Sequence, residues 1–162
     1  MKKIELVIFD LDDTLFDTTG TLDHTYKGLP DIRLFPGVKD ILKKMSSLSI
    51  PKILATRGDS QMQHKKIDIL GVREDFNKIV ICSTDEEKHT AFTSVISDYG
   101  IKDPSLVLVV GNRIDSEIRY GNMLGCTTIH IKHGRYAELV PKDSFEIPHI
   151  TVLKTSDIAA YF

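Results

Sequence analysis

Three carboxylates stand within four positions, at Asp10, Asp12 and Asp13, directly after the apolar run Leu6–Phe9. Such a run is typical of a strand that is buried on both faces of a parallel sheet. In an open α/β sheet the ligand crevice lies at the carboxyl ends of the strands, so Asp10 is placed for chemistry. Asp10 and Asp12 can face the same side, where their repulsion favours a bound cation or a shared proton. The alternative is a solvated acidic turn, because Asp is common in turns.

Polar residues also follow two other predicted strands. Thr56 and Arg57 follow the strand predicted at residues 52–55, and Asn112 comes shortly after the one predicted at residues 106–110. A hydroxyl beside free backbone N–H groups suits a phosphoryl oxygen, although a Thr in this place is more often a helix cap. Arg57 could reach an anion or could serve only at the surface. Asn112 can bind a hard cation through its carbonyl oxygen but brings no charge.

Lys88 falls in the first turn of a predicted helix that opens with Thr84-Asp85-Glu86-Glu87. Thr84 and Glu87 form a capping-box pattern, which marks the start of this helix. The helix dipole disfavours a cation in the first turn, so the position favours a specific role for Lys88. The alternative is a solvated surface Lys, since Lys is rarely buried.

The rest of the chain is expected to hold these residues at one edge of a sheet. Periodicity and caps predict helices at residues 38–48, 60–70, 84–99 and 115–124, and a short last helix capped by Thr155 or Ser156. Strands are predicted at residues 6–9, 52–55, 78–82, 106–110, 126–131 and 150–153. Residues 16–30 show no helical period and are expected to form a loop or a short hairpin. The alternation predicts an α/β fold with a doubly wound, mainly parallel sheet, in a single domain over residues 1–162.

Composition narrows the class of protein. A chain of 162 residues, 41% hydrophobic and 27% charged, is typical of one globular domain. A net charge of −2 gives no bulk signal for nucleic-acid binding. We find no signal-peptide pattern and no apolar stretch of membrane-spanning length, and therefore expect a cytoplasmic protein. Cys82 and Cys126 lie in predicted strands and are expected to be buried thiols rather than a disulfide.

Residues 10–15, Asp-Leu-Asp-Asp-Thr-Leu, follow an apolar strand and resemble the first motif of the haloacid dehalogenase (HAD) superfamily. Thr56 matches the second motif, residues 88–92 resemble the third, and residues 111–118 resemble the fourth. The four stand in the order of the family, over roughly residues 4–134. The fourth departs from the usual Gly-Asp with a second acid a few residues later, because Asn112 stands at its first acidic position.

The resemblance implies a Rossmann-like core that carries a phosphatase. Asp10 would attack the phosphorus of a phosphate ester and form an aspartyl-phosphate. Asp12 would protonate the leaving group and then activate water. Thr56 and Lys88 would hold the transferring oxygens, and Arg57 would help to bind the substrate. An acid at Asp12 favours a phosphatase over the dehalogenases and P-type ATPases of the same superfamily.

The resemblance also implies a Mg²⁺ cofactor, held by Asp10, by the backbone carbonyl of Asp12 and by a residue of the fourth motif. Asn112 would coordinate through its amide oxygen, and Asp115 or Glu117 would supply negative charge. Because Asn112 is uncharged, we expect a weaker metal site than usual. Asp115 could also be a helix N-cap, and both roles can hold.

No cap domain is expected over this site. Residues 16–34 number about nineteen, too few for a helical cap, and residues 58–87 are filled by an ordinary helix and strand. An open site would admit a phosphorylated small molecule or a phosphorylated macromolecule, or a neighbouring subunit of a homo-oligomer would cover it. The Thr-rich residues 17–28 are the expected local lid.

Asn112 supports a competing hypothesis, a weakly active or non-catalytic protein that binds a phosphorylated ligand or partner. The presence of Asp10, Asp12, Thr56 and Lys88 argues instead for hydrolysis. Phosphoryl transfer to an acceptor other than water is left open, whereas a mutase would need a cap to keep water out.

Overall fold

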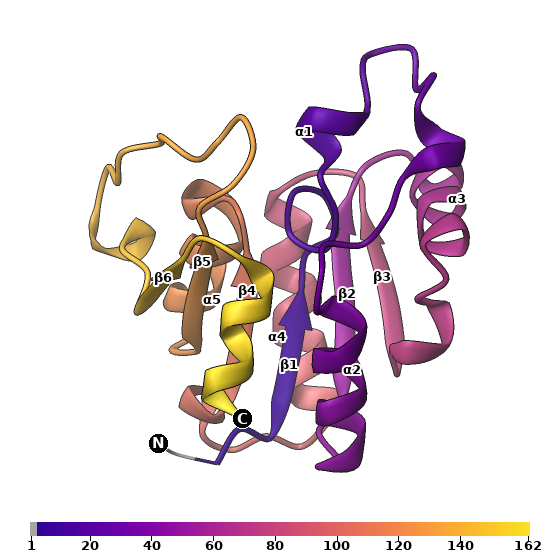
Figure 1. Ribbon diagram of the computed structural model, residues 1–162. Coiled ribbons are helices and arrows are strands. Elements are labelled where there is room, and N and C mark those ends of the chain that lie inside the picture. The colour runs from indigo at the N-terminus through magenta and orange to yellow at the C-terminus, as the bar shows by residue number, and fades with distance from the viewer. Residues whose placement is uncertain (1–2) are drawn as a thin grey trace.

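A parallel sheet of six strands forms the centre of the computed structural model, which describes residues 3–162. Its order is β3-β2-β1-β4-β5-β6, and each neighbouring pair is parallel. The strands are β1 (Leu6–Phe9), β2 (Lys52–Arg57), β3 (Lys78–Cys82), β4 (Val107–Gly111), β5 (Thr127–Ile131) and β6 (Ile150–Val152). The central strands β1 and β4 are buried along their whole length. The predicted doubly wound parallel sheet is confirmed, and the segment that contains α1 (Thr18–Thr21) lies beyond the carboxyl ends of its strands (Figure 1).

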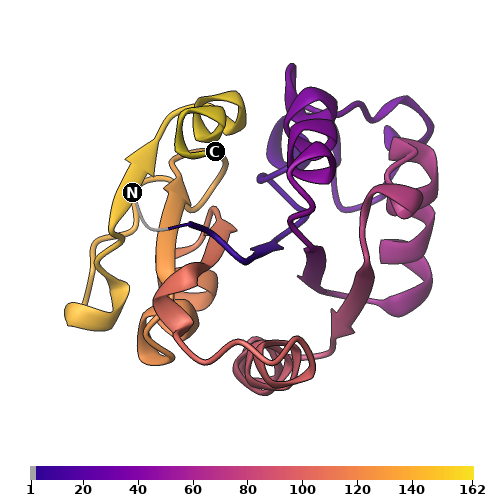
Figure 2. The same ribbon diagram turned by 90° about the horizontal axis from the view of Figure 1, so that it is seen from below.

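Helices cover both faces of the sheet (Figure 2). The remaining α-helices are α2 (Val38–Ser47), α3 (Ser60–Leu70), α4 (Glu86–Asp98) and α5 (Arg119–Met123). The 3₁₀ turns span Leu29–Asp31, Arg73–Asp75, Pro104–Leu106, Ser144–Glu146 and Thr155–Tyr161. Helices α2 and α3 and the last 3₁₀ helix pack on one face, and α4 and α5 pack on the other. Within residues 3–162, no helix has the length and apolar character needed to cross a membrane.

The alternation of side chains along β1 builds both halves of the core. Val7 and Phe9 join the apolar cluster beneath α2 and α3, whereas Leu6 and Ile8 join the cluster beneath α4. Complete burial of such a side chain contributes about 1.5–3 kcal/mol. Burial therefore fixes the position of β1. Asp10 follows at the carboxyl end of this strand, where its N–H donates to the carbonyl of Val110 at 2.9 Å.

Residues 16–30 differ from the prediction, because α1 occupies part of the expected loop or hairpin. The carboxylate of Asp17 caps α1 by accepting a hydrogen bond from the N–H of Gly20 at 2.8 Å. One helical turn is too short to show a hydrophobic period. The capping residue Asp17 was therefore the only feature of the sequence that could have indicated α1.

Two other helices also start differently from the prediction. The helix expected at residues 115–124 begins as a π-helical turn over Ile114–Ile118 and continues as α5. The last helix begins after Lys154, and the hydroxyl of Thr155 donates to the carbonyl of Thr14 at 2.6 Å instead of capping that helix. Thr155 therefore fastens the last helix to the segment that follows β1.

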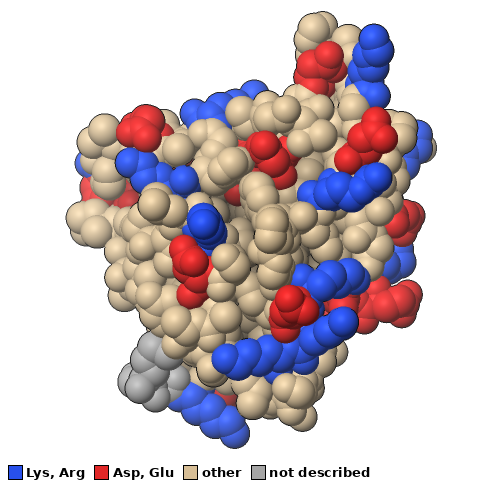
Figure 3. Space-filling view, in the orientation of Figure 1, with Lys and Arg blue, Asp and Glu red and all other residues tan. Residues whose placement is uncertain are grey.

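Cys82 and Cys126 are free and buried, as predicted. Burial raises the pKa of both thiols, to about 12 for Cys126. On the face seen in Figure 3, basic and acidic side chains are interspersed rather than gathered in one basic patch.

Gly121 brings α5 close to the sheet, and its replacement is expected to destabilise the fold. A Cβ at this position would lie 2.8 Å from Thr128 Cγ2 and 3.1 Å from Val109 Cβ. Thr128 cannot rotate away freely, because its hydroxyl hydrogen-bonds to Asn122 at 2.9 Å. We expect Gly121→Ala to lower the free energy of unfolding by about 1–3 kcal/mol despite the better helix propensity of Ala.

Urea unfolding measures this effect. Thr93→Ala on the exposed face of α4 is a suitable control, because surface substitutions usually change stability by less than about 0.5 kcal/mol. An increase in stability for Gly121→Ala would show that helix propensity outweighs the close packing.

Candidate active site

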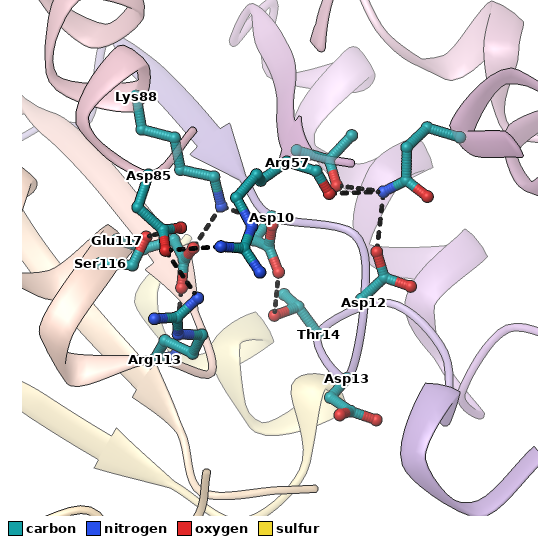
Figure 4. Close-up of polar contacts among 12 residues, drawn as sticks. Asp10, Asp12, Asp13, Thr14, Arg57, Asp85, Lys88, Arg113, Ser116 and Glu117 are labelled. Atoms are coloured by element: carbon teal, nitrogen blue, oxygen red, sulfur yellow. Dashed lines mark hydrogen bonds and ion pairs between the residues drawn. The ribbon is translucent and has the colours of Figure 1, made fainter. Parts of the chain in front are cut away.

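A cavity of about 430 Å³ opens at the carboxyl ends of the central strands. The predicted site residues among its lining are Asp10, Asp12, Arg57, Lys88 and Asn112. These residues come from the ends of three strands and from the first turn of α4, as the sequence predicted. Figure 4 shows Lys88 pointing toward Asp10, with Asp12 in the loop that follows it.

Asp10 and Lys88 form an ion pair at the bottom of this cavity. Lys88 Nζ lies 2.9 Å from Asp10 Oδ1 and also contacts the carboxylate of Glu117. All three side chains are buried, and Lys88 is 2% exposed. Burial raises the pKa of Asp10 to about 7, Lys88 opposes this rise, and Glu117 and Asp12 add to it. Burial alone would lower the pKa of Lys88, but the two carboxylates outweigh it and raise that pKa.

The start of α4 explains how a lysine comes to be buried in a first turn. The side chain of Thr84 accepts from the N–H of Glu87 at 3.3 Å, and the Glu87 carboxylate accepts from the N–H of Ser83 at 2.7 Å. The predicted capping box is thus formed only in part. These contacts fix the orientation of the first turn, so Lys88 points toward the end of β1 rather than into solvent. Lys88 is therefore buried beside Asp10 rather than solvated at the surface.

Two residues that sequence reasoning missed hold the Asp12 carboxylate. Lys66 Nζ lies 2.6 Å from Asp12 Oδ1, and Gln63 Nε2 donates to Asp12 Oδ2 at 2.8 Å. The hydroxyl of Thr18 also donates to Oδ1, at 2.8 Å. Gln63, Lys66, Ile67 and Leu70 are the buried residues of α3. Polar residues within a helical stripe of buried positions were the signal that could have revealed this contact.

The hydroxyl of Thr56 is completely buried and does not line the cavity. It accepts a hydrogen bond from Gln63 Nε2 at 2.7 Å, so Gln63 lies between Thr56 and the open space. Arg57 does line the cavity, and its Nη1 lies 3.0 Å from the carboxylate of Asp85. Asp85 also accepts from Arg113 Nη1 at 3.0 Å, so one carboxylate orients two guanidinium groups at the rim (Figure 4).

Asn112 directly follows β4 and is buried. Its backbone carbonyl accepts a hydrogen bond from His130 Nε2 at 3.1 Å, and its Nδ2 lies 3.5 Å from the carbonyl of His133. Burial lowers the pKa of His130, which keeps the ring neutral and able to donate one hydrogen bond. His130 and His133, whose roles the sequence left open, therefore orient Asn112.

Of the two later acids of the fourth motif, the structure brings Glu117 and not Asp115 to the cavity. Asp115 accepts from Arg113 Nε at 3.0 Å and from Nη2 at 3.1 Å, and it does not line the cavity. Glu117 lines the cavity, and the π-helical turn directs its carboxylate at Lys88. A Cβ on Gly111 would lie 2.5 Å from Glu117 Cγ, so the glycine makes room for this side chain.

The donor set at the end of β1 fits a hard cation. Asp10 and Asn112 line the same cavity and offer a carboxylate and an amide oxygen, and the backbone carbonyl of Asp12 follows Asp10 two positions later in the chain. Asp10 and Glu117 are two buried carboxylates that share one buried cation, Lys88. A divalent cation would offset the remaining negative charge.

A second group of potential ligands lies at the side of the cavity that Asp13 lines. One ligand atom each of Asp13, Asp17 and His133 lies within 4.8 Å of the others, and His133 Nε2 is 3.0 Å from Asp17 Oδ1. Asp13 is already bonded to the N–H of Thr19, at 2.8 Å. This group includes none of the predicted metal ligands. Its contacts join the α1 segment to the loop that follows β5.

Comparison with known proteins identifies the family. The model of the family described as haloacid dehalogenase-like hydrolase matches residues 20–125. The chain belongs to the haloacid dehalogenase-like hydrolase family. The matched part of this HAD-like hydrolase begins after residues 10–15, so the likeness of Asp10 and Asp12 to the first motif rests on their own sequence and on their place after β1.

Relatives and solved structures agree with this assignment. Glyceraldehyde 3-phosphate phosphatase of Methanopyrus kandleri is 24% identical over 124 residues, which are 75% of this chain and 53% of that protein. This HAD-like chain thus spans about half the length of that relative. A predicted phosphoglycolate phosphatase from Haemophilus somnus has a TM-score of 0.82 at 15% identity and 99% coverage of both chains. A haloacid dehalogenase-like protein from Streptococcus pneumoniae has a TM-score of 0.78 at 18% identity and complete coverage of both. These structural likenesses show the fold.

This HAD-like hydrolase is a capless member of the family over the described residues. Between β1 and α2 the chain forms only α1 and the turn Leu29–Asp31. Between β2 and β3 it forms only α3 and the turn Arg73–Asp75. Among residues 3–162, no inserted domain covers the cavity, as the sequence predicted.

Proposed function

We propose that the protein is a Mg²⁺-dependent phosphatase that hydrolyses a phosphate monoester through an aspartyl-phosphate on Asp10, with residues 1–162 acting as one HAD-like domain. The observation that carries this proposal is the buried Asp10–Lys88 pair at the bottom of an open cavity, next to Asp12. A nucleophile, a cation for the transferring oxygens and a second carboxylate for proton transfer then share one space.

The reaction follows from these three side chains. Asp10 attacks phosphorus, and the bond from phosphorus to the leaving oxygen breaks while the aspartyl-phosphate forms. Asp12 gives its proton to the leaving oxygen, then takes a proton from water, which attacks the phosphorus and releases phosphate and free Asp10. Lys88 stays positively charged throughout and stabilises the charge on Asp10 and on the transferring oxygens. Arg57 extends this positive surface to the rim.

Mg²⁺ would be held by the Asp10 carboxylate, the Asp12 backbone carbonyl and the Asn112 amide oxygen, and it would offset negative charge between nucleophile and substrate. Asn112 stands where the fourth motif usually has an acid, and Glu117 would supply the negative charge that is missing there. The contacts favour Glu117 over the predicted Asp115, because Glu117 faces Lys88 whereas Asp115 pairs with Arg113. Thr56 supports the site indirectly through Gln63, because its hydroxyl is buried beneath that residue.

A phosphorylated small molecule is the substrate that the cavity supports best. Its volume, about 430 Å³, is in the range of pockets for small ligands. The Methanopyrus relative, by its name, acts on such a compound. The open rim also admits a phosphorylated macromolecule or the surface of a second subunit. The two free, buried thiols suit the reducing cytoplasm.

Removal of the metal tests the proposal. Hydrolysis of 4-nitrophenyl phosphate is expected in Mg²⁺ and is expected to disappear in EDTA, because the carboxylates would then repel the phosphate. Asn112→Asp is expected to lower the half-saturating Mg²⁺ concentration by about tenfold, since it adds a charged oxygen ligand. The measurement is initial rate against free Mg²⁺ for both proteins.

The competing function is binding of a phosphorylated ligand without turnover, and Asn112 is the observation that favours it. A folded protein that gives no turnover above an Asp10→Asn control at any Mg²⁺ concentration would support that alternative. If Asn112→Asp then gave turnover, the inactivity of the wild type would be due to the absence of a negative charge at position 112.

A further inference from the structure

Lys66 is a nearly buried lysine outside the four motifs of the family. Its side chain is 6% exposed, and its Nζ lies 2.6 Å from Asp12 Oδ1. The same ammonium lies 6.0 Å from the centroid of the Phe16 ring and 5.7 Å from that of Tyr26. Lysine is almost never buried to this extent without a partner, so Lys66 and Asp12 depend on each other.

Gln63 lies one helical turn before Lys66 and engages the other oxygen of the same carboxylate. Its Nε2 donates to Asp12 Oδ2 at 2.8 Å and is also 2.7 Å from the Thr56 hydroxyl and 3.1 Å from the Arg57 carbonyl. The amide therefore ties Asp12 to the end of β2. Gln63 is 2% exposed, so it cannot exchange these partners for water without moving.

We propose that Lys66 and Gln63 are positioning residues that hold the Asp12 carboxylate in the orientation for proton transfer, an inference that rests on the function proposed above. Each carboxylate oxygen has two acceptor sites. Oδ2 accepts from Gln63 at one of them, which leaves the other for the proton that passes to the leaving oxygen. Lys66 fixes Oδ1, so the carboxylate cannot turn about its own axis.

Dependence on the leaving group separates this role from a purely structural one. A 4-nitrophenolate leaves without a proton, whereas an alcohol must receive one as its bond to phosphorus breaks. The value of kcat/KM reports the steps up to departure of the leaving group. Loss of positioning should therefore lower kcat/KM more strongly as the leaving group becomes more basic.

The experiment compares wild type, Lys66→Met and Lys65→Met on 4-nitrophenyl, phenyl and benzyl phosphate at saturating Mg²⁺. For Lys66→Met we expect kcat/KM to fall by less than about threefold on 4-nitrophenyl phosphate and by about 30-fold or more on benzyl phosphate, since general acid catalysis contributes about 10²–10⁴-fold. Lys65→Met, from the exposed side of α3, should behave as wild type. In an Asp12→Asn background, Lys66→Met should add no further dependence on the leaving group.

An equal loss on all three esters, or an undiminished effect in the Asp12→Asn background, would overturn the positioning role. Lys66→Met is expected to fold, because 27% of the Asp12 side chain is exposed and water can solvate it. If circular dichroism shows that it does not fold, Gln63→Leu removes no charge and must give the same pattern. Absence of turnover by the wild type on every ester would instead refute the proposed function itself.

Discussion

Asp10→Asn is expected to lower hydrolysis of 4-nitrophenyl phosphate by at least about 10⁴-fold, the order that loss of a catalytic nucleophile costs in other enzymes. The amide keeps the shape of the side chain but is a poor nucleophile toward phosphorus. The measurement is the initial rate in Mg²⁺. Asp98→Asn, at an exposed carboxylate that forms an ion pair with Lys78, is the matched control and should keep full activity.

The same substitution should not destabilise the protein. Burial raises the pKa of Asp10 from its ordinary 3.8 to about 7, so the native state binds this proton more tightly than the unfolded chain. By linkage, the contribution of Asp10 to stability falls as the pH rises from about 4 to 7. At pH 8 Asp10→Asn should therefore be at least as stable as wild type in urea. A loss of activity that accompanies unfolding would leave the nucleophile unassigned and contradict this expectation.

Lys88→Met is expected to have the largest effect on stability. It leaves Asp10 and Glu117 as two buried carboxylates without their shared cation, and the loss of one partner from a buried ion pair costs about 3–5 kcal/mol. Activity should be lost as well, because no cation would remain beside the nucleophile. Urea unfolding at neutral pH measures the first effect.

Two further variants distinguish the effect of breaking a buried ion pair from the effect of removing any lysine charge. Lys78→Met removes an exposed ion pair with Asp98 and should cost less than about 1 kcal/mol. Adding Glu117→Gln to Lys88→Met removes one of the unpaired carboxylates and should restore part of the stability. If Lys88→Met and Lys78→Met were equally stable, the buried network would not contribute to folding.

The fold could be predicted from the sequence because each strand carries a local signal. Leu6–Phe9 and the strand after Leu106 are apolar runs, and Gly71 ends α3 in the left-handed conformation that favours glycine. The π-helical turn after Asn112 could not be predicted, since an extra residue in a helical turn leaves no mark on composition or period. That turn decides that Glu117 faces Lys88 while Asp115 pairs with Arg113.

The site residues that could be predicted are those that follow a strand or lie in the first turn of a helix. Asp10, Asp12 and Lys88 were found in this way, and the structure brings them to one cavity. Gln63 and Lys66 were missed because they act from the middle of α3, and their contacts with Asp12 span more than fifty positions of sequence. Only the tertiary packing of α3 against the loop after β1 brings them together.

Trapping of the intermediate tests the central claim most directly. The wild type is mixed with 4-nitrophenyl phosphate and Mg²⁺, quenched in acid during turnover and digested, and the peptides are analysed by mass spectrometry. We expect a phosphoryl group on Asp10 that disappears once the substrate is exhausted. Continued hydrolysis with no phosphorylated peptide, or with the phosphoryl group on a residue other than Asp10, would contradict the proposed mechanism.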